Sequence, residues 1–154
     1  IINLKKTYWR FSTSSQLVWF KNNIYTQDTH SCLFLDKKLI GYTLLRNRKI
    51  FLNNSEIKYL LVDTVMISKK FRNNSFGNLL MKFNNNLIKK KNCIGFLVCK
   101  KKLVRFYEQN NWKNIIKSKF FLDGKKSKLN GMYYNLSKKQ QNELTKNSFY
   151  ILTN

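Results

Sequence analysis

Residues 62–80 read Val-Asp-Thr-Val-Met-Ile-Ser-Lys-Lys-Phe-Arg-Asn-Asn-Ser-Phe-Gly-Asn-Leu-Leu, and this stretch decides the fold. An apolar run is followed by a polar turn that contains Arg72, Ser75 and Gly77, and the turn leads directly into an amphipathic segment. Such a strand–turn–helix junction directs backbone N–H groups and the positive end of a helix dipole to one point. The sequence therefore predicts an anion site, suited to phosphate, at the start of this helix. The alternative is an ordinary junction in which the arginine and the glycine occur by chance.

A second informative stretch, residues 103–112, reads Leu-Val-Arg-Phe-Tyr-Glu-Gln-Asn-Asn-Trp. Together the two stretches resemble the GNAT superfamily of N-acyltransferases. The superfamily's coenzyme turn is usually Arg/Gln-x-x-Gly-x-Gly/Ala, and here Ser75 replaces the first glycine of residues 72–77. Its second motif ends Phe-Tyr-Glu-Lys-x-Gly-Phe/Trp, and here Asn111 replaces the glycine. Asparagine is the residue that next best tolerates the left-handed conformation needed there. Lys100 stands where the superfamily often has an asparagine.

The resemblance implies that the chain binds acetyl-CoA and that the turn holds its pyrophosphate. By resemblance, the donors are the backbone amides of Asn73, Ser75, Gly77 and Asn78. Gly77 is expected to let the backbone approach the phosphates closely. Arg72 is expected to add a charge-assisted contact or to fix the loop.

The resemblance also assigns roles on either side of this turn. The amide of Val65 is expected to polarise the thioester carbonyl as an oxyanion donor, and Ile67 to pair with the pantetheine arm as an added strand would. Tyr107 is the superfamily's usual general acid, since a phenol with a pKa of about 10 can protonate the departing thiolate. A tyrosine that only packs in the core is the alternative.

Asp63 is the most informative single side chain, because it lies in the apolar run of residues 60–67. Burying an unpaired carboxylate is costly, so such a group is expected to have a partner or a function. In the superfamily, a carboxylate on this strand often orients the substrate amine or removes its proton, and desolvation would raise the pKa of such an acid. The alternative is a structural aspartate bonded to a neighbouring amide or lysine. Glu56 and Glu108 are weaker candidates for the same role.

The hydrophobic pattern predicts a sequence of short elements. Ser12–Ser15 are expected to cap a helix that continues to Ile24. Residues 137–154 are expected to form an extra C-terminal helix, begun by Ser137, or a tail. The other expected elements are strands at 1–6, 31–35, 39–52, 57–68 and 93–99, helices at 76–91 and 103–108, turns at 36–38 and 53–55, and a closing hairpin of 120–121 and 132–136 around Asp123-Gly124.

This order matches that of the GNAT superfamily. It predicts an α/β (α+β) fold with a mixed, mostly antiparallel central sheet of six to seven strands flanked by helices. The sheet is expected to splay between its fourth and fifth strands, at 57–68 and 93–99. Neither an internal repeat nor a linker is visible, so residues 1–154 are expected to form a single acyl-CoA N-acyltransferase domain.

The net charge is extreme, at +23 from 30 Lys and Arg against 7 Asp and Glu. A polyanionic partner such as RNA or a phosphorylated substrate is one interpretation. The other is genome composition, because Lys and Asn are abundant along the whole chain, Pro is absent, and runs such as Asn84-Asn85-Asn86 are typical of AT-rich codons. The even spread of charge favours composition. With either origin, the positive field attracts the phosphates of a coenzyme.

The composition argues against several classes of protein. Apolar residues make up 43% of the 154, which argues against disorder. The cysteines, Cys32, Cys93 and Cys99, are odd in number, and His30 is the only histidine, so neither a disulfide framework nor a metal site is expected. This cysteine usage favours a reducing compartment, and we expect a cytoplasmic protein. Neither a membrane span nor a secretory signal is visible. Because the chain begins at Ile1 and not at Met, the presence of further residues upstream is left open.

The leading hypothesis is an acetyl-CoA-dependent N-acetyltransferase that acts on a primary amine by direct attack. Spacing around residues 63–80 resembles both glucosamine-phosphate N-acetyltransferases and aminoglycoside-type acetyltransferases. A phosphorylated amino sugar such as glucosamine 6-phosphate suits the positive field better than a polycationic aminoglycoside does. Protein or peptide acetylation is the enzymatic alternative. An RNA-binding module on a degenerate acyltransferase fold is the alternative from another class, and a homodimer is expected by analogy only.

Overall fold

The computed structural model describes residues 1–52, 55–115, 120–146 and 149–151. These residues form two compact units, the first made of Ile1–Arg46 with Val62–Asn84 and the second of Asn47–Leu61 with Asn85–Asn154. That residues 1–154 act as one domain stays a prediction. Of the predicted turn at 53–55, residues 53 and 54 lie outside the described residues, and Ser55 begins a strand. No helix in the described part of the chain is long and apolar enough to cross a membrane.

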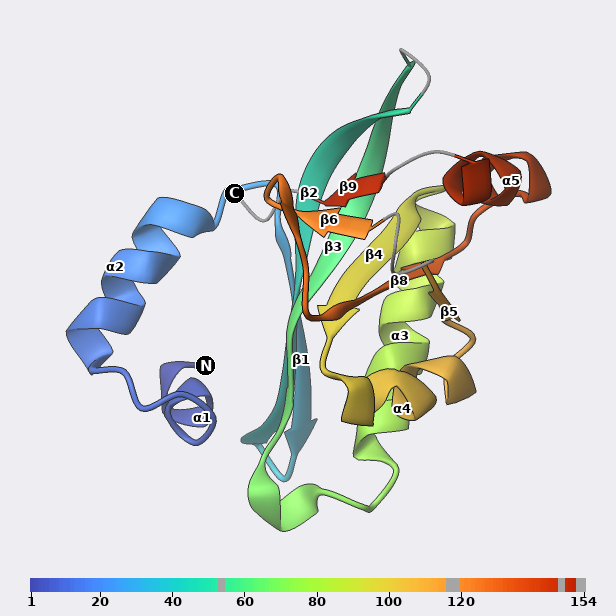
Figure 1. The fold of residues 1–154 in the computed structure, drawn as a ribbon. Coiled ribbons are helices and arrows are strands. Elements are labelled where there is room, and N and C mark those ends of the chain that lie inside the picture. The colour runs from blue at the N-terminus through green and yellow to red at the C-terminus, as the bar shows by residue number, and fades with distance from the viewer. Residues whose placement is uncertain (53–54, 116–119, 147–148, 152–154) are drawn as a thin grey trace. The chain divides into compact units, whose positions relative to one another are not determined.

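Six strands form one hydrogen-bonded sheet in the order β1-β2-β3-β4-β8-β5 (Figure 1). β3 and β4 are parallel, whereas β1 with β2, β4 with β8 and β5 with β8 are antiparallel. This arrangement confirms the predicted mixed sheet. The bounds are β1 Thr29–Leu35, β2 Lys38–Leu52, β3 Ser55–Ile67, β4 Ile94–Cys99, β5 Lys113–Asn114 and β8 Asn130–Tyr134.

The parallel ladder between β3 and β4 is short. It joins Tyr59–Leu61 to Ile94–Phe96 and ends there, although β3 continues to Ile67. These are the two strands between which the sequence predicts a splay, and the short ladder agrees with that expectation. The rest of β3 has main-chain groups that this ladder does not use.

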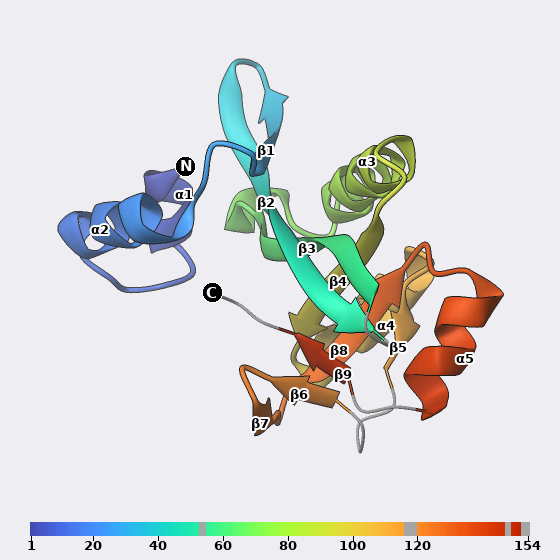
Figure 2. The ribbon, with the colours of Figure 1, turned by 90° about the horizontal axis from the view of Figure 1, so that it is seen from above.

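In the first unit, two short helices cover one face of β1 and β2. Figures 1 and 2 show α1 (Ile2–Lys6) and α2 (Thr13–Asn23) on the side of these strands opposite the first half of α3 (Phe76–Lys90). Asp36 and Lys37, both left-handed, connect β1 to β2, as a two-residue hairpin turn requires. Ser12 caps α2 as predicted, because its Oγ accepts the amide of Ser15 at 3.1 Å.

The prediction of a strand at residues 1–6 is wrong, because this segment forms α1. Leu4 is buried in a cluster with Tyr42, Leu44 and Met66. The helix ends where the Thr7 hydroxyl donates to the carbonyl of Leu4 at 2.8 Å. A segment this short has too little hydrophobic periodicity to identify its structure, and packing against the sheet decides it.

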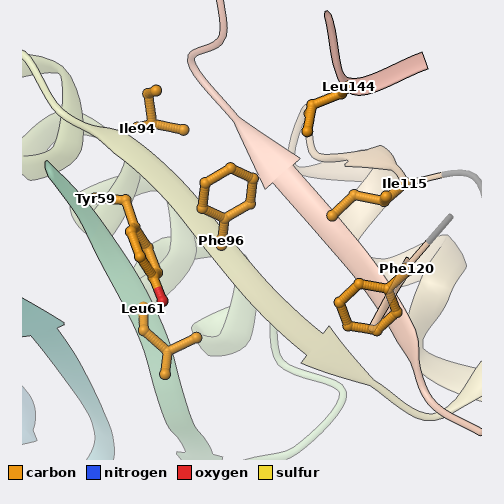
Figure 3. Close-up of a cluster of buried hydrophobic side chains, with 7 residues drawn as sticks. All are labelled: Tyr59, Leu61, Ile94, Phe96, Ile115, Phe120 and Leu144. Carbon is orange, nitrogen blue, oxygen red and sulfur yellow. The ribbon is translucent and has the colours of Figure 1, made fainter. Parts of the chain in front are cut away.

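The core of the second unit lies between its strands and α5 (Lys138–Lys146), as Figure 3 shows. Phe96 contacts Tyr59 edge to face at 5.2 Å between ring centroids. Ser137 begins α5 as predicted, in a reciprocal cap with Gln140: each backbone amide donates to the other's side chain, at 3.2 and 2.9 Å. The buried cluster consists of Tyr59, Leu61, Ile94, Phe96, Ile115, Phe120 and Leu144.

The predicted closing hairpin is formed by a different pair of strands in the structure. Asp123 and Gly124, both left-handed, join β6 (Phe120–Leu122) to β7 (Lys125–Lys126) and not to residues 132–136. β6 also pairs in parallel with β9 (Phe149–Ile151) in a separate three-stranded sheet. β8 instead lies between β4 and β5 in the main sheet. A two-residue turn pairs the residues that flank it directly, so the correct partner was the adjacent Lys125–Lys126.

A buried hydrogen-bond network fixes the end of α4 (Val104–Gln109) in the second unit. The side chain of Asn85 donates to the carbonyl of Asn110 and accepts the indole N–H of Trp112, both at 2.9 Å. Asn111 is left-handed, with φ of 65°, which confirms the conformation expected where the motif usually has glycine. The network connects α3 to the helix that carries Tyr107.

Replacing Asn85 should therefore destabilise the fold. Asn85→Ala leaves the buried indole N–H of Trp112 unpaired, which is expected to cost about 1–3 kcal/mol in the free energy of unfolding. Asn86→Ala, at the exposed neighbouring position of the same helix, is the matched control and should change it by less than about 0.5 kcal/mol. Urea denaturation measures both, and equal effects of the two substitutions would contradict the role of the network.

Candidate active site

The turn before α3 has the backbone geometry of an anion site. A single 3₁₀ turn, Lys69–Phe71, follows β3, and the chain then reaches Ser75, whose carbonyl accepts the amide of Leu79 at 3.0 Å. Ser75 thus stands at the N-cap position, and the amides of the first helical turn are directed to this end of the helix. Asn73 and Ser75 are left-handed, with φ of 65° and 58°. A left-handed residue followed by a helical one forms a concave nest of N–H groups.

Ser75 therefore takes the conformation that glycine adopts most easily. Gly77 lies within the first turn of α3 in helical conformation, so it is not required there for a positive φ. Its predicted role in close approach to phosphate stays a prediction. The rings of Phe71 and Phe76 meet edge to face, with centroids 6.2 Å apart, and this contact joins the two ends of the turn.

The charge around the turn is uniformly positive. Lys69, Lys70 and Arg72 are exposed, and residues 64–107 contain neither aspartate nor glutamate. Because no carboxylate of this long segment competes for the amides or the cations, the turn suits a ligand with several negative charges. Electrostatics and backbone geometry thus point to the same kind of ligand.

Arg72 fixes the loop in this structure, which is one of the two roles that the sequence suggests. Its Nε donates to the carbonyl of Ile67 at 3.2 Å, and its guanidinium carbon lies 4.5 Å from the ring centroid of Tyr8. Tyr8 also contacts Ile67 directly. Its hydroxyl accepts the amide of Ile67 at 2.9 Å and donates to the carbonyl of the same residue at 2.5 Å.

The backbone of β3 changes direction at the residue before Val65. Thr64 is left-handed within the strand, with φ of 57°, which is costly for a β-branched side chain. Such a residue interrupts the regular alternation of a strand, as a bulge does, and re-aims the groups that follow it. The amide of Val65, the expected oxyanion donor, follows this point directly.

Asp63 has a buried arginine as its partner. Its carboxylate lies 3.6 Å from the guanidinium of Arg46, and the side chains are 33% and 3% exposed, respectively. The hydroxyl of Thr64 donates to the same carboxylate at 3.0 Å, and Arg46 also donates to the carbonyl of Asn23 at 3.1 Å. The aspartate is thus held by neighbours and remains partly open to solvent. Asp63 therefore has the partner that the sequence analysis requires of it, and its role toward a substrate amine stays a prediction.

A second cation lies near Asp63 on the face covered by α1 and α2. Lys5 is 8% exposed, and its ammonium lies 4.1 Å from the ring centroid of Trp19. Burial lowers the pKa of Lys5, and the negative charge of Asp63 opposes that shift. The surroundings of Asp63 therefore combine two buried cations with an aromatic ring, none of which the sequence analysis identified.

Tyr107 belongs to the second unit and is 6% exposed. Burial, and to a lesser degree the nearby Cys99 thiol, raise its pKa above the ordinary value of 10. The phenol therefore keeps its proton throughout the neutral range, as a proton donor must. Its carbonyl accepts the amides of Asn110 and Trp112 at 2.9 and 3.1 Å, which fixes the end of α4.

The raised pKa predicts a pH dependence of stability. A phenol whose folded pKa exceeds its unfolded value stabilises the fold fully below about pH 10, and this contribution is lost as the pH rises further. Tyr107→Phe should therefore flatten the decline in melting temperature between about pH 9 and about pH 11. Burial also raises the pKa of Tyr42, so part of the decline in melting temperature should remain in this variant. Tyr25→Phe, at a half-exposed site, is the control, and a Tyr107→Phe curve parallel to the wild type would contradict the shift.

The structure brings most of the predicted site residues together in the first unit: Asp63, Val65, Ile67, Arg72, Asn73, Ser75, Gly77 and Asn78. Sequence reasoning missed Tyr8 and Arg46. The sequence around each of them gives no sign of its role, because each contacts a residue that is distant in the chain. Among the described residues, no three His, Cys, Asp or Glu side chains are placed to hold a metal ion.

Comparison with known proteins gives matches at the level of structure. No family model and no curated protein matches this sequence. Similar solved structures include a GCN5-related N-acetyltransferase from Anabaena variabilis, with a TM-score of 0.63 and 12% identity over 73% of this chain. The chain has the GCN5-related N-acetyltransferase (GNAT) fold. It spans only 28–30% of the length of this protein and two others with similar scores.

Two further structures with the GNAT fold match over most of their own length. One is an aminoglycoside 6'-N-acetyltransferase complexed with coenzyme A, with a TM-score of 0.61 and 11% identity, covering 86% of this chain and 87% of that one. The other is the glucosamine-6-phosphate N-acetyltransferase from Arabidopsis thaliana, with a TM-score of 0.59 and 17% identity, covering 72% and 80%. At such identities the likeness shows the fold, and the activity is argued from the site.

Proposed function

We propose that this protein is an acetyl-CoA-dependent N-acetyltransferase. The turn at residues 72–78 is the observation that carries this proposal. It combines left-handed Asn73 and Ser75 with the N-terminus of a long helix, and the exposed cations of residues 69, 70 and 72 lie in or directly before it. Backbone amides and a helix dipole suit a pyrophosphate, and the surrounding positive charge suits the further phosphate of the coenzyme. The residues present therefore fit the coenzyme.

Acetyl-CoA supplies an acetyl thioester, whose carbonyl carbon is open to attack by an amine. In the proposed reaction, Asp63 attracts and orients the acceptor's ammonium, which must lose its proton before it attacks. The amide of Val65 donates a hydrogen bond to the thioester oxygen as negative charge develops there. Tyr107 donates its proton to the sulfur that leaves as the amide bond forms. The products are an N-acetylated amine and a free thiol.

A phosphorylated amino sugar such as glucosamine 6-phosphate is the acceptor that we favour. Its phosphate suits a chain with a net charge of +23, whereas a polycationic aminoglycoside would be repelled. The amine of an amino sugar is also less basic than a lysine side chain, so less free energy is needed to deprotonate it at neutral pH. Protein or peptide amines are the alternative acceptors.

Coenzyme binding at the turn can be tested with one substitution in α3. Gly77→Glu places a carboxylate in the first turn of α3, where an acidic residue stabilises a helix but repels a pyrophosphate. The dissociation constant for acetyl-CoA should rise about tenfold or more, from the repulsion of like charges a few ångströms apart. Calorimetric titration measures the constant, and thermal melting checks that the fold is intact.

Asn86→Glu is the matched control, because it adds the same charge at an exposed position of α3 far from its N-terminus. It should leave the dissociation constant within about twofold of the wild type. Equal effects of both substitutions would place the coenzyme elsewhere. If acetyl-CoA does not stabilise the wild type, but RNA binds tightly with a steep dependence on salt, the protein is an RNA-binding module instead.

Acetyl transfer itself is tested by the release of coenzyme A thiol with a panel of amines. Glucosamine 6-phosphate should give the highest kcat/KM, ahead of glucosamine, a lysine peptide and an aminoglycoside. Tyr107→Phe should lower turnover while leaving the affinity for acetyl-CoA nearly unchanged, because it removes only the proton donor. Full activity of Tyr107→Phe would refute the assigned acid, and robust release with the peptide alone would refute the assigned acceptor.

A further inference from the structure

The end of β3 has main-chain groups that point away from β2. Ser68 donates its amide to the carbonyl of Ile40 on β2 at 2.7 Å. Because successive residues of a strand direct their N–H and C=O groups to opposite edges, those of Ile67 point to the other edge. The ladder with β4 does not include them, since it ends at Leu61. Ile67 therefore presents an amide and a carbonyl for pairing, as a strand does when it binds an extended ligand.

Tyr8 occupies both of these groups. Its hydroxyl accepts the Ile67 amide at 2.9 Å and donates to the Ile67 carbonyl at 2.5 Å. Arg72 completes the arrangement, with its Nε 3.2 Å from the same carbonyl and its guanidinium 4.5 Å from the Tyr8 ring centroid. One tyrosine, 59 residues away in sequence from Ile67, thus engages two residues of the proposed coenzyme site.

We propose that residues 7–11 form a strap that covers the proposed coenzyme site through Tyr8, and that acetyl-CoA must displace this strap in order to bind. This inference rests on the proposed function. An amide carries a single hydrogen, so Ile67 cannot donate it fully to Tyr8 and to the pantetheine arm at once. Displacement of Tyr8 also releases Arg72 from its ring, so that the guanidinium can turn to the phosphates.

The side chains of the strap lie outside the buried core, whereas α1 is anchored in it. Tyr8, Trp9 and Phe11 are 36%, 38% and 63% exposed, so none of the three belongs to the buried core. Leu4, by contrast, is buried in the core of the first unit. The strap can therefore open about the end of α1 without loss of this packing, as expected of segments with few buried contacts.

Tyr8→Phe tests the proposal, because it keeps the ring beside Arg72 and removes only the hydroxyl that engages Ile67. The variant should bind acetyl-CoA about tenfold more tightly in calorimetric titration, since two competing hydrogen bonds are lost. Tyr25→Phe removes the hydroxyl of another exposed tyrosine near the N-terminus and should bind as the wild type does.

A second measurement follows the strap itself. Arg10 is exposed within it, and an arginine-specific protease should cleave after Arg10 faster when acetyl-CoA is added to the wild type. In Tyr8→Phe this cleavage should be fast without coenzyme. If Tyr8→Phe binds acetyl-CoA as tightly as the wild type does, or more weakly, the strap proposal is wrong. The proposed function would remain intact in either case. If acetyl-CoA binds neither the wild type nor any variant, both the strap and the proposed function are wrong.

Discussion

The proposed coenzyme site depends on how the chain passes from β3 into α3. An apolar strand must end, turn and begin a helix within a few residues, and Asn73 and Ser75 achieve this by taking left-handed conformations. The same geometry leaves the helix N-terminus facing a turn with three exposed cations. We therefore expect anion binding to follow from this junction, because backbone amides and the positive end of the helix dipole coincide there. No specific side chain is needed to create it.

The opposite end of the site depends on packing around β3. Thr64 breaks the regular strand, Asp63 is held by Arg46, and Ile67 is engaged by Tyr8. Both contacts come from residues that lie outside the recognisable motifs, Arg46 of β2 and Tyr8 after α1. The N-terminal segment therefore does more than cover the sheet, since its Tyr8 holds the main chain of Ile67. Arg46 of β2 holds Asp63.

Most of the secondary structure and the strand–turn–helix junction before α3 could be predicted from sequence, because both depend on local patterns. The strand–turn–helix pattern gave α3 within one residue, and Asn111 could be recognised as left-handed from its position in a motif. Residues 1–6 were misread because their structure depends on Leu4 packing against distant strands. The pairing of β8 was misread because strand order is a long-range property. Tyr8 and Arg46 were missed for the same reason, as each contact joins residues far apart in the chain.

The most direct test of the central claim observes the amides themselves. In a ¹⁵N–¹H correlation spectrum of the whole chain, titration with acetyl-CoA should move the amide protons of Asn73, Ser75, Gly77 and Asn78 downfield, since hydrogen bonds to phosphate deshield them. The amides of the distant exposed residues of α3, such as Asn86, should change little. Unchanged signals at residues 73–78, with binding seen elsewhere or not at all, would contradict the account.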